Sequence, residues 1–294
     1  MPAHQPIAPL AGVRILSLSL NLPGPAALMR CRQMGAECAK LEPPPQPGHA
    51  SSDPMGIYCP EAYATMHAGV RVLHTNLKAA EGQALVAAEL AQTDVLLTSF
   101  RPSALAKLGL AWEALHARYP RLSLVRIVGS PGMAAEEPGH DLTYMAQVGL
   151  VTGTELPPTL FADMGGALMA SEAVLQAQLA RAQTGVGCCI DVALSDAAAW
   201  LGLPRRWGLT TAQGDVGGKH AGYRVYHCAD GRVALAALEP HFAGRLFALV
   251  QLPPHTDPHA PDVHQATAEW LRGKSRQELD AIASEQDLPL YTMA

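Results

Sequence analysis

Three short segments of the chain place acidic or basic side chains directly beside turns. His140 and Asp141 follow a Pro-Gly turn in "EEPGHDLTY", and Asp163 stands in "FADMGG" just before a long apolar stretch. Glu239 ends a strand-like run in "LEPHF". Imidazole and carboxylate groups move protons during catalysis when their pKa values lie near neutrality. These segments are therefore candidates for general acid–base chemistry.

Each position also has an ordinary structural explanation. Asp141 and Asp163 precede apolar helical patterns, where an aspartate commonly caps the first turn of a helix. His140 would be an exposed loop residue, and Glu239 would be an acid at a strand end before a proline. Taken one at a time, the four side chains favour the structural explanation, so a functional assignment needs evidence from the rest of the chain.

Other common catalytic and binding motifs are absent from the sequence. The turn "NLPGPAAL" lacks the G-x-G-x-x-G of dinucleotide-binding proteins, although Glu42 stands where such proteins hold a ribose. This turn could still present the amides of a helix N-terminus to a phosphate. No G-x-S-x-G segment indicates a hydrolase serine. Prolines interrupt the His-rich segment 255–264, so we expect a solvated loop there and no metal site.

Composition limits the class of protein. The chain has 294 residues, of which 49% are hydrophobic and 16% charged, enough apolar material for a large core or two domains. Its formal net charge is −5 and its basic residues are scattered, which argues against nucleic-acid or membrane-surface binding. The sequence has no 18-residue apolar window, no secretory signal pattern and no CxxC pair. We therefore expect a soluble, cytoplasmic protein with reduced cysteines.

Strand-like and helix-like segments alternate over the first 130 residues. The pattern continues with a long helix from Met164 to about Arg181 and a strand over 188–194. The expected strands are almost continuously apolar, as in parallel sheets that helices cover on both faces. This predicts an α/β fold with a doubly wound, Rossmann-like sheet. The earlier strands are expected over 13–20, 37–42, 70–77, 94–100 and 122–129, with a Pro- and Ser-rich loop over 43–56.

The last third of the chain has a different pattern. Gly and polar residues dominate 204–222, which suggests a linker. A hairpin is predicted over 223–239, and two helices are predicted within 264–287. The expected division is a large Rossmann-like domain over 1–203, a linker over 204–222 and a smaller α+β domain over 223–294.

Several segments resemble the class III CoA-transferase family, which also contains the α-methylacyl-CoA racemases. The family's first strand, N-x-x-G-P turn and helix are similar to "PLAGVRILSLSLNLPGPAALMRCRQMGAECAKLE". Its next block, with an F-R-P turn, resembles "NLKAAEGQALVAAELAQTDVLLTSFRPSALAKLGLAWEAL". Its R-x-x-T-G-x-G helix end resembles "ARAQTGVGCCIDVALSDAA". These motifs occur in the family's order over nearly the whole chain, so the chain is identified as a member.

Two details resemble the racemase branch. Racemases have the Gly-His-Asp seen at His140, where transferases generally have an aromatic residue, and an L-E-P-x-F segment like the one around Glu239. Both branches have a catalytic aspartate at the position of Asp163. The resemblance further implies an interlocked homodimer, in which Glu239 of a second chain would orient His140 or share a proton with it.

The resemblance implies how these residues would act. Inverting a carbon next to a thioester requires one group to remove a proton and another to return one to the opposite face. His140 and Asp163 would flank that carbon, and the glycines at 165 and 166 are expected to open a backbone amide to the enolate oxygen. No metal or cofactor is expected beyond coenzyme A, which is part of the substrate.

The resemblance places the CoA pocket around Lys40, Arg71, Arg101 and the turn at Pro23 and Gly24. Prolines replace the family's arginine after the second strand, and the basic segment before the third strand lacks its lysine. Because CoA has several phosphate charges, these two changes are expected to weaken its binding. Family members continue beyond "LPLYTMA", so the small domain is expected to be shortened.

Three functions agree with this pattern. The first is a racemase or epimerase that inverts the α-carbon of a 2-methylacyl-CoA by two-base proton transfer through an enolate. The second is a CoA transferase in which Asp163 is the nucleophile and forms an acyl anhydride. The third is a divergent, non-catalytic acyl-CoA-binding protein. An acyl-CoA thioester is the expected ligand in all three.

Overall fold

The computed structural model describes residues 7–49, 51–253 and 255–294. Contacts divide the chain into two compact units, of which the first ends at Gly202 and the second begins at Leu203. The predicted linker therefore belongs to the second unit. The start of the N-terminal segment, in which no secretory signal is expected, lies outside the described residues.

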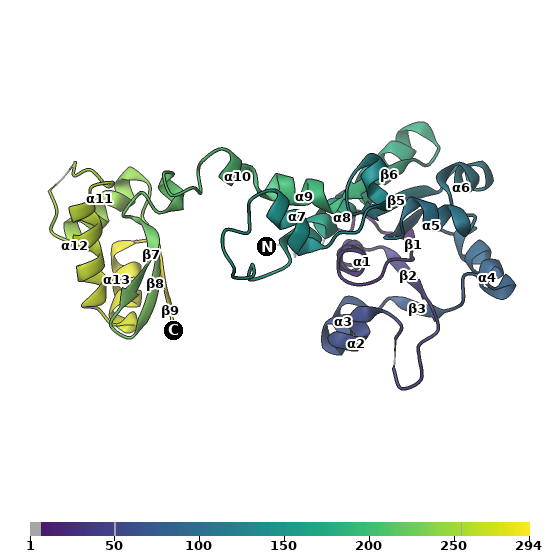
Figure 1. Cartoon of the computed structure of the whole chain (residues 1–294), viewed down its shortest axis with the longest axis horizontal. Coiled ribbons are helices and arrows are strands. Elements are labelled where there is room, and N and C mark those ends of the chain that lie inside the picture. Colours follow the sequence, from purple (N-terminus) through teal and green to yellow (C-terminus); the bar gives the residue numbers. More distant parts are fainter. Residues whose placement is uncertain (1–6, 50, 254) are drawn as a thin grey trace, which may run out of the picture. The chain divides into compact units, whose positions relative to one another are not determined.

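The first unit contains a six-stranded parallel sheet with the strand order β3-β2-β1-β4-β5-β6 (Figure 1). This is the strand order of doubly wound, Rossmann-like folds, in which the winding direction reverses between β1 and β4. The predicted α/β sheet is therefore confirmed. Its strands are β1 (Arg14–Ser17), β2 (Glu37–Glu42), β3 (Arg71–His74), β4 (Val95–Thr98), β5 (Ser123–Val128) and β6 (Cys189–Ala193).

Helices cover both faces of this sheet. Neighbouring residues of a strand point to opposite sides, so each strand contributes apolar side chains to both faces. Ile15 packs into a core with α1 and α8, whereas the next residue, Leu16, packs into a second core with α4, α5 and α6. Strands that are buried on both faces are mostly apolar, as here, although β2 also contains the buried Lys40 and Glu42. The helices on the first face are α1 (Pro23–Gln33) and α8 (Phe161–Thr184), and those on the second are α4 (Ala80–Leu90), α5 (Pro102–Lys107) and α6 (Trp112–Arg118).

Shorter elements connect the strands. The segment predicted as a loop over 43–56 ends in a helix, because Asp53 accepts a hydrogen bond from the N–H of Met55 and Pro54 suits the first helical turn. The sequence did not predict this helix or the next one, since both are too short for a helical pattern to show. The shorter elements of the first unit are α2 (Pro54–Tyr58), α3 (Pro60–Met66), η1 (Gly132–Glu136), α7 (Asp141–Gln147) and α9 (Leu194–Leu201).

The second unit contains a three-stranded antiparallel sheet, β7-β8-β9, with its own hydrophobic core. The predicted hairpin is present as β7 (Tyr223–Cys228) and β8 (Gly231–Ala236). The third strand, β9 (Leu290–Met293), was not predicted, because it is a four-residue edge strand that is only partly buried. The remaining elements are α10 (Leu203–Arg206), η2 (Asp215–Gly217), α11 (Pro240–Leu249), α12 (Pro261–Arg272) and α13 (Arg276–Gln286).

Helix length and polarity bear on membrane insertion. Among the residues described above, no helix is both long and apolar enough to cross a bilayer.

Candidate active site

A cavity of about 500 Å³ opens at the C-terminal ends of the strands of the first unit. It is formed by segments that follow β1, β4, β5 and β6, where ligands bind in doubly wound sheets. His140 and Asp163 both line it, so the structure brings two of the predicted acid–base residues together. Other lining residues include Leu20, Asn21, Leu22, Pro23, Tyr58, Ser99, Arg101, Gly129, Glu137, Gly139, Asp141, Tyr144 and Leu160.

His140 is the residue before α7, and its side chain is exposed. Its backbone N–H donates to the hydroxyl of Thr143 at 3.1 Å, and this hydroxyl donates to the carbonyl of His140 at 2.7 Å. These contacts fix the backbone at the start of the helix. The imidazole is not used for them and remains available to the cavity.

Asp163 is the third residue of α8, and Leu160 occupies the capping position. The expectation that Asp163 caps the helix is therefore wrong. Its backbone N–H donates instead to the carboxylate of Asp141 at 3.0 Å, and Asp141 is buried. The Asp141 side chain thus joins the start of α7 to the start of α8, which fixes His140 and Asp163 on the same cavity.

The pKa of the Asp163 carboxyl is raised from 3.8 to about 6, chiefly by burial and to a smaller extent by the neighbouring Asp141 carboxylate. The closeness of His140 acts in the opposite direction on this pKa. A carboxyl that titrates near pH 6 can both accept and release a proton under physiological conditions. These properties suit a general acid or base.

The glycines after Asp163 serve helix packing. A Cβ atom on Gly166 would stand 2.3 Å from Leu194, and one on Gly165 would stand 3.1 Å from Leu201, both residues of α9. On the side of the missing side chains α9 occupies the space, and the expectation that these glycines open a backbone amide to an oxyanion stays a prediction. Their small size allows α8 and α9 to approach closely.

Tyr144 adds a hydroxyl to the cavity wall. The side chain is 4% exposed, and a Cβ atom on Gly129 or Gly139 would stand only 2.2 or 2.3 Å from its hydroxyl. Both glycines therefore make room for this group. Burial raises the pKa of Tyr144, as does the nearby Asp163, so the hydroxyl stays protonated at neutral pH and can donate. Sequence reasoning missed Tyr144, because a single tyrosine in an apolar helical pattern gives no signal of its function.

Glu239 belongs to the second unit. It precedes α11, its side chain is exposed, and it makes no capping hydrogen bond there. Its pairing with His140 stays a prediction.

Two of the residues predicted to bind CoA, Arg101 and Pro23, line the cavity. Arg101 precedes α5 and is exposed, and Pro23 is the first residue of α1. Gly24 is buried, and a Cβ atom there would stand 2.0 Å from the Cβ atom of Ser19. Gly24 therefore allows α1 to pack against the end of the first strand segment.

Arg71 lies at the other edge of the sheet. It begins β3, pairs in register with Ala39, and makes two hydrogen bonds of 3.0 and 2.6 Å to the carboxylate of Glu89. The cavity stands at the C-terminal ends of the strands, so Arg71 is not part of it. Arg71 therefore does not line this cavity, and its predicted contact with CoA stays a prediction.

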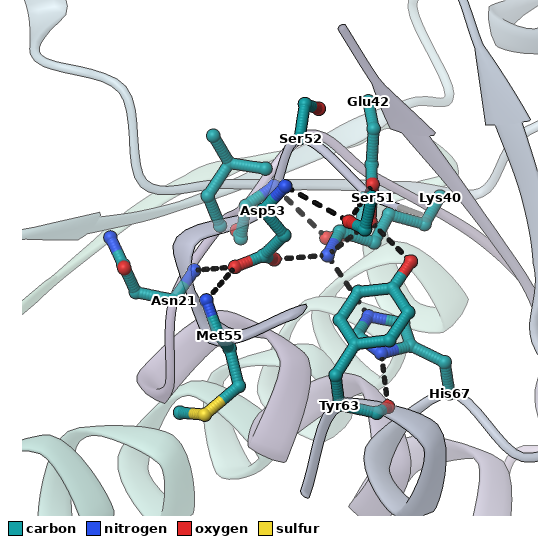
Figure 2. A network of polar contacts seen from close by, with 12 residues as sticks. Asn21, Lys40, Glu42, Ser51, Ser52, Asp53, Met55, Tyr63 and His67 are labelled. Atoms are coloured by element: carbon teal, nitrogen blue, oxygen red, sulfur yellow. Dashed lines mark hydrogen bonds and ion pairs between the residues drawn. The ribbon is translucent and has the colours of Figure 1, made fainter. Parts of the chain in front are cut away.

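Lys40 is fully buried within the first unit (Figure 2). Its ammonium lies 2.5 Å from Asp53, 2.8 Å from Glu42 and 2.9 Å from His67. This ammonium has no exposed surface, and its predicted contact with CoA stays a prediction. Glu42, Asp53 and His67 also form a group that could hold a metal ion, but Lys40 already occupies the place between them.

A comparison with known families identifies the group to which the chain is related. The sequence profile of CoA-transferase family III matches residues 10–293. The chain belongs to this family. Members of CoA-transferase family III that resemble it include both transferases and racemases.

Individual relatives differ in how much of them is matched. The chain is 31% identical to succinyl-CoA–D-citramalate CoA-transferase of Chloroflexus aurantiacus, over 99% of the chain and 81% of that protein. It is 29% identical to human α-methylacyl-CoA racemase. That match covers 79% of the chain and 62% of the racemase. The two reactions are represented at nearly equal identity, so family membership alone leaves the reaction open.

Solved structures agree on the fold. The crystal structure of Rv3272 from Mycobacterium tuberculosis superposes with a TM-score of 0.81 at 24% identity, covering 97% of the chain and 83% of that structure. A CaiB/BaiF family protein from Brucella suis superposes with a TM-score of 0.78, also at 24% identity, covering 98% and 84%. These likenesses concern the fold alone.

Proposed function

We propose that the protein is an acyl-CoA racemase or epimerase that inverts the α-carbon of a 2-methylacyl-CoA thioester. The observation that supports this most is the shared cavity of His140 and Asp163, together with the rise of the Asp163 pKa to about 6. An imidazole, and a carboxyl whose pKa is about 6, can each accept or release a proton. A two-base reaction needs this pair.

In the proposed reaction, ionised Asp163 removes the α-proton of one epimer and protonated His140 returns a proton to the opposite face. The roles are reversed for the other epimer. The electron pair left by the α-proton passes to the thioester oxygen, which becomes an enolate oxygen. The Tyr144 hydroxyl lines the same cavity and would donate a hydrogen bond to this oxygen, where charge develops.

Arg101 is the cationic side chain that we propose for CoA. Its guanidinium stands at the cavity and can pair with a phosphate through two N–H groups. We propose no cofactor besides the CoA of the substrate.

We further propose that the protein is a homodimer that acts in the cytoplasm. In such a dimer, Glu239 of a second chain would hydrogen-bond to His140 and favour its protonated form. The six cysteines are all free, which fits a reducing compartment.

CoA transfer is the second candidate, favoured by the similarity to the Chloroflexus aurantiacus transferase. Here the Asp163 carboxylate would attack the thioester carbonyl and release CoA thiolate, leaving an acyl anhydride on Asp163. A nucleophile of this kind must be ionised at neutral pH. A carboxyl with a pKa of about 6 is mostly ionised at neutral pH, so this pKa suits both reactions. We prefer the racemase because His140 lines the same cavity and would be the second acid–base group that only the racemase needs.

Incubation with a 2-methylacyl-CoA in heavy water separates the candidates. The racemase incorporates deuterium at the α-carbon, detected by mass spectrometry, while the CoA ester stays intact. A transferase instead moves CoA from the acyl-CoA to a free carboxylate. Calorimetric binding without either reaction would leave a non-catalytic acyl-CoA-binding protein, and a lack of α-deuterium would overturn the racemase proposal.

Two substitutions assign the roles. We expect His140→Ala to lower α-exchange by about 10²-fold or more. Tyr144→Phe should lower kcat by roughly ten- to a hundredfold if its hydroxyl donates to the enolate oxygen. His227→Ala is the control, because His227 is exposed on β7 and is given no role. Equal losses in all three variants would contradict the assignment.

A further inference from the structure

A buried cation in the first unit binds three different acceptors (Figure 2). The ammonium of Lys40, on β2, contacts Asp53, Glu42 and His67. Lys40 and Asp53 are both 0% exposed, and Glu42 is 1% exposed. An ammonium has three N–H donors, so these contacts satisfy it completely.

The histidine in this cluster must be neutral. Its Nδ1 lies 2.7 Å from the carbonyl oxygen of Tyr63, which can only accept, so Nδ1 has the proton. Nε2 is then free to accept from Lys40 at 2.9 Å. Burial lowers the pKa of His67, and the charge of Lys40 lowers it further, which agrees with this tautomer.

Stability alone is a weak reason for such a cluster. Burying charged groups costs several kcal/mol per ion, and apolar residues in their place are often as stable. The hydrogen bonds of the cluster show which segments it joins. Glu42 accepts hydrogen bonds from Ser51 and Tyr63, which bind the irregular segment around α2 and α3 to β2.

Asp53 connects the cluster to the cavity. One carboxylate oxygen, Oδ2, faces Lys40, and the other, Oδ1, accepts from the backbone N–H groups of Asn21 and Met55 at 3.0 and 2.9 Å. Asn21 lies in the turn between β1 and α1, and the residues of this turn form one wall of the cavity. The buried cation therefore orients a carboxylate whose second oxygen holds the cavity wall.

The turn needs this support because of its conformation. Asn21 has a φ of 65°, in the left-handed region that non-glycine residues adopt at a cost. Without a fixed acceptor for its N–H, the turn would relax toward other conformations. Such a movement would displace whatever binds between this turn and the His140 and Asp163 side of the cavity.

We propose that Asp53 is a positioning residue for the cavity, and that Lys40 acts through it. Asp53 fixes the Asn21 turn, and Lys40 fixes the orientation of the Asp53 carboxylate. Neither residue would touch the substrate. The catalytic consequence rests on the proposed function, whereas the anchoring of the turn does not.

The chain offers a matched control at the other end of β1. Asp94 also accepts a backbone N–H, that of Arg14, at 2.8 Å, and also pairs with a cation, Arg181, at 2.6 Å. Neither Asp53→Ala nor Asp94→Ala leaves a cation alone, because Lys40 keeps Glu42 and Arg181 keeps an oxygen of Gln178. Each variant removes a carboxylate that joins a cation to a backbone N–H group at one end of β1, although Asp53 is fully buried and the Asp94 side chain is 27% exposed.

The first measurement is amide hydrogen exchange of the folded protein, followed by mass spectrometry. Asp53→Ala should speed exchange in peptides that contain Asn21 by about tenfold or more, since the acceptor is lost. Asp94→Ala should leave these peptides unchanged and speed those that contain Arg14. Unchanged exchange at Asn21 in Asp53→Ala would overturn the anchoring, whether or not the protein is a racemase.

The second measurement is α-deuterium exchange, well below the melting temperature of each variant. Asp53→Ala should lower kcat by tenfold or more, because misplacing the reacting carbon by about 1 Å can cost 10²-fold. KM should change less than kcat, and Asp94→Ala should keep kcat within about twofold. A structural role without positioning would lower both melting temperatures and leave both kcat values near that of the wild type.

Two further variants distinguish a loss of positioning from misfolding. Asp53→Asn keeps the shape of the side chain but has only one acceptor oxygen, which cannot face both Lys40 and the N–H of Asn21. Its effects on hydrogen exchange and kcat should therefore have the same direction as those of Asp53→Ala and be smaller. Lys40→Met combined with Asp53→Ala should be no worse in kcat than Asp53→Ala alone, because both residues act through one contact. If the double variant lost the sum of the effects of the two single variants on kcat, Lys40 would not act through Asp53. If the wild type shows no α-exchange, the racemase proposal fails while hydrogen exchange still decides the anchoring.

Discussion

Asp163 shows at the level of a single residue how a functional group can weaken the fold. Its pKa is about 6 in the folded protein, whereas an unfolded chain leaves it at 3.8. The folded state therefore favours the neutral acid. The stabilisation due to the neutral form is complete below pH 4 and is lost as the pH rises through about 6.

Asp163→Asn should make the protein more stable at pH 7.5. The ionised carboxylate costs the fold about 1–3 kcal/mol there, at 1.36 kcal/mol per pKa unit, and the amide removes this cost. Urea unfolding at pH 7.5 and at pH 4 measures the difference, which should vanish at the lower pH. A variant that is less stable than the wild type at pH 7.5 would contradict the raised pKa. The same variant should lose α-exchange.

Packing of α1 against the first strand illustrates the scale of secondary-structure elements. Gly24 lies in the first turn of α1, where a Cβ atom would stand 2.0 Å from Ser19, which is fully buried and cannot move aside. Gly24→Ala should therefore lower the free energy of unfolding by about 1–3 kcal/mol, the usual cost of overpacking. Thermal unfolding of the first unit measures this.

Gly244→Ala is the matched control for that substitution. Gly244 lies inside α11, and no atom would stand within 4 Å of an added Cβ. Alanine favours helices over glycine by roughly 0.5–1 kcal/mol, so the change should stabilise the second unit. Similar losses at both positions would show that contact with Ser19 is not the cause.

An exposed apolar surface on α8 bears on the whole molecule. Phe161, Met164 and Leu168 are 38, 40 and 51% exposed, and their spacing places them along one helix face. Exposed apolar patches of this kind mark interaction sites. We expect this face to contribute to the proposed homodimer.

Leu168→Glu should weaken that dimer by at least about tenfold, because a charge would be buried at the contact. Sedimentation velocity should show a wild-type species of twice the 31.0 kDa chain mass and a smaller one for the variant. Met133→Glu is the control, since Met133 is 95% exposed and belongs to η1, not to α8. A wild-type monomer at micromolar concentration would overturn the dimer proposal.

The sequence predicted the strands well because their signal is local. Residues 37–42 were expected as a strand and form β2 over the same residues, although Lys40 and Glu42 within it are buried charged residues. The long helix was found but begins at Phe161, three residues before Met164. Short elements such as α3 and β9 were missed because so few residues form no readable periodicity.

Side-chain chemistry was determined by the sequence, whereas the location of each charge was decided by the tertiary structure. The types and order of His140, Asp163 and the family motifs indicated an acid–base site and its family without any coordinates. Lys40 and Arg71 show the limit of that approach. Both look like phosphate-binding cations, but one is enclosed by carboxylates and the other stands at the opposite edge of the sheet. The burial and pKa of a side chain, and its access to a ligand, depend on residues that are distant in the sequence. Only the tertiary structure therefore determines them.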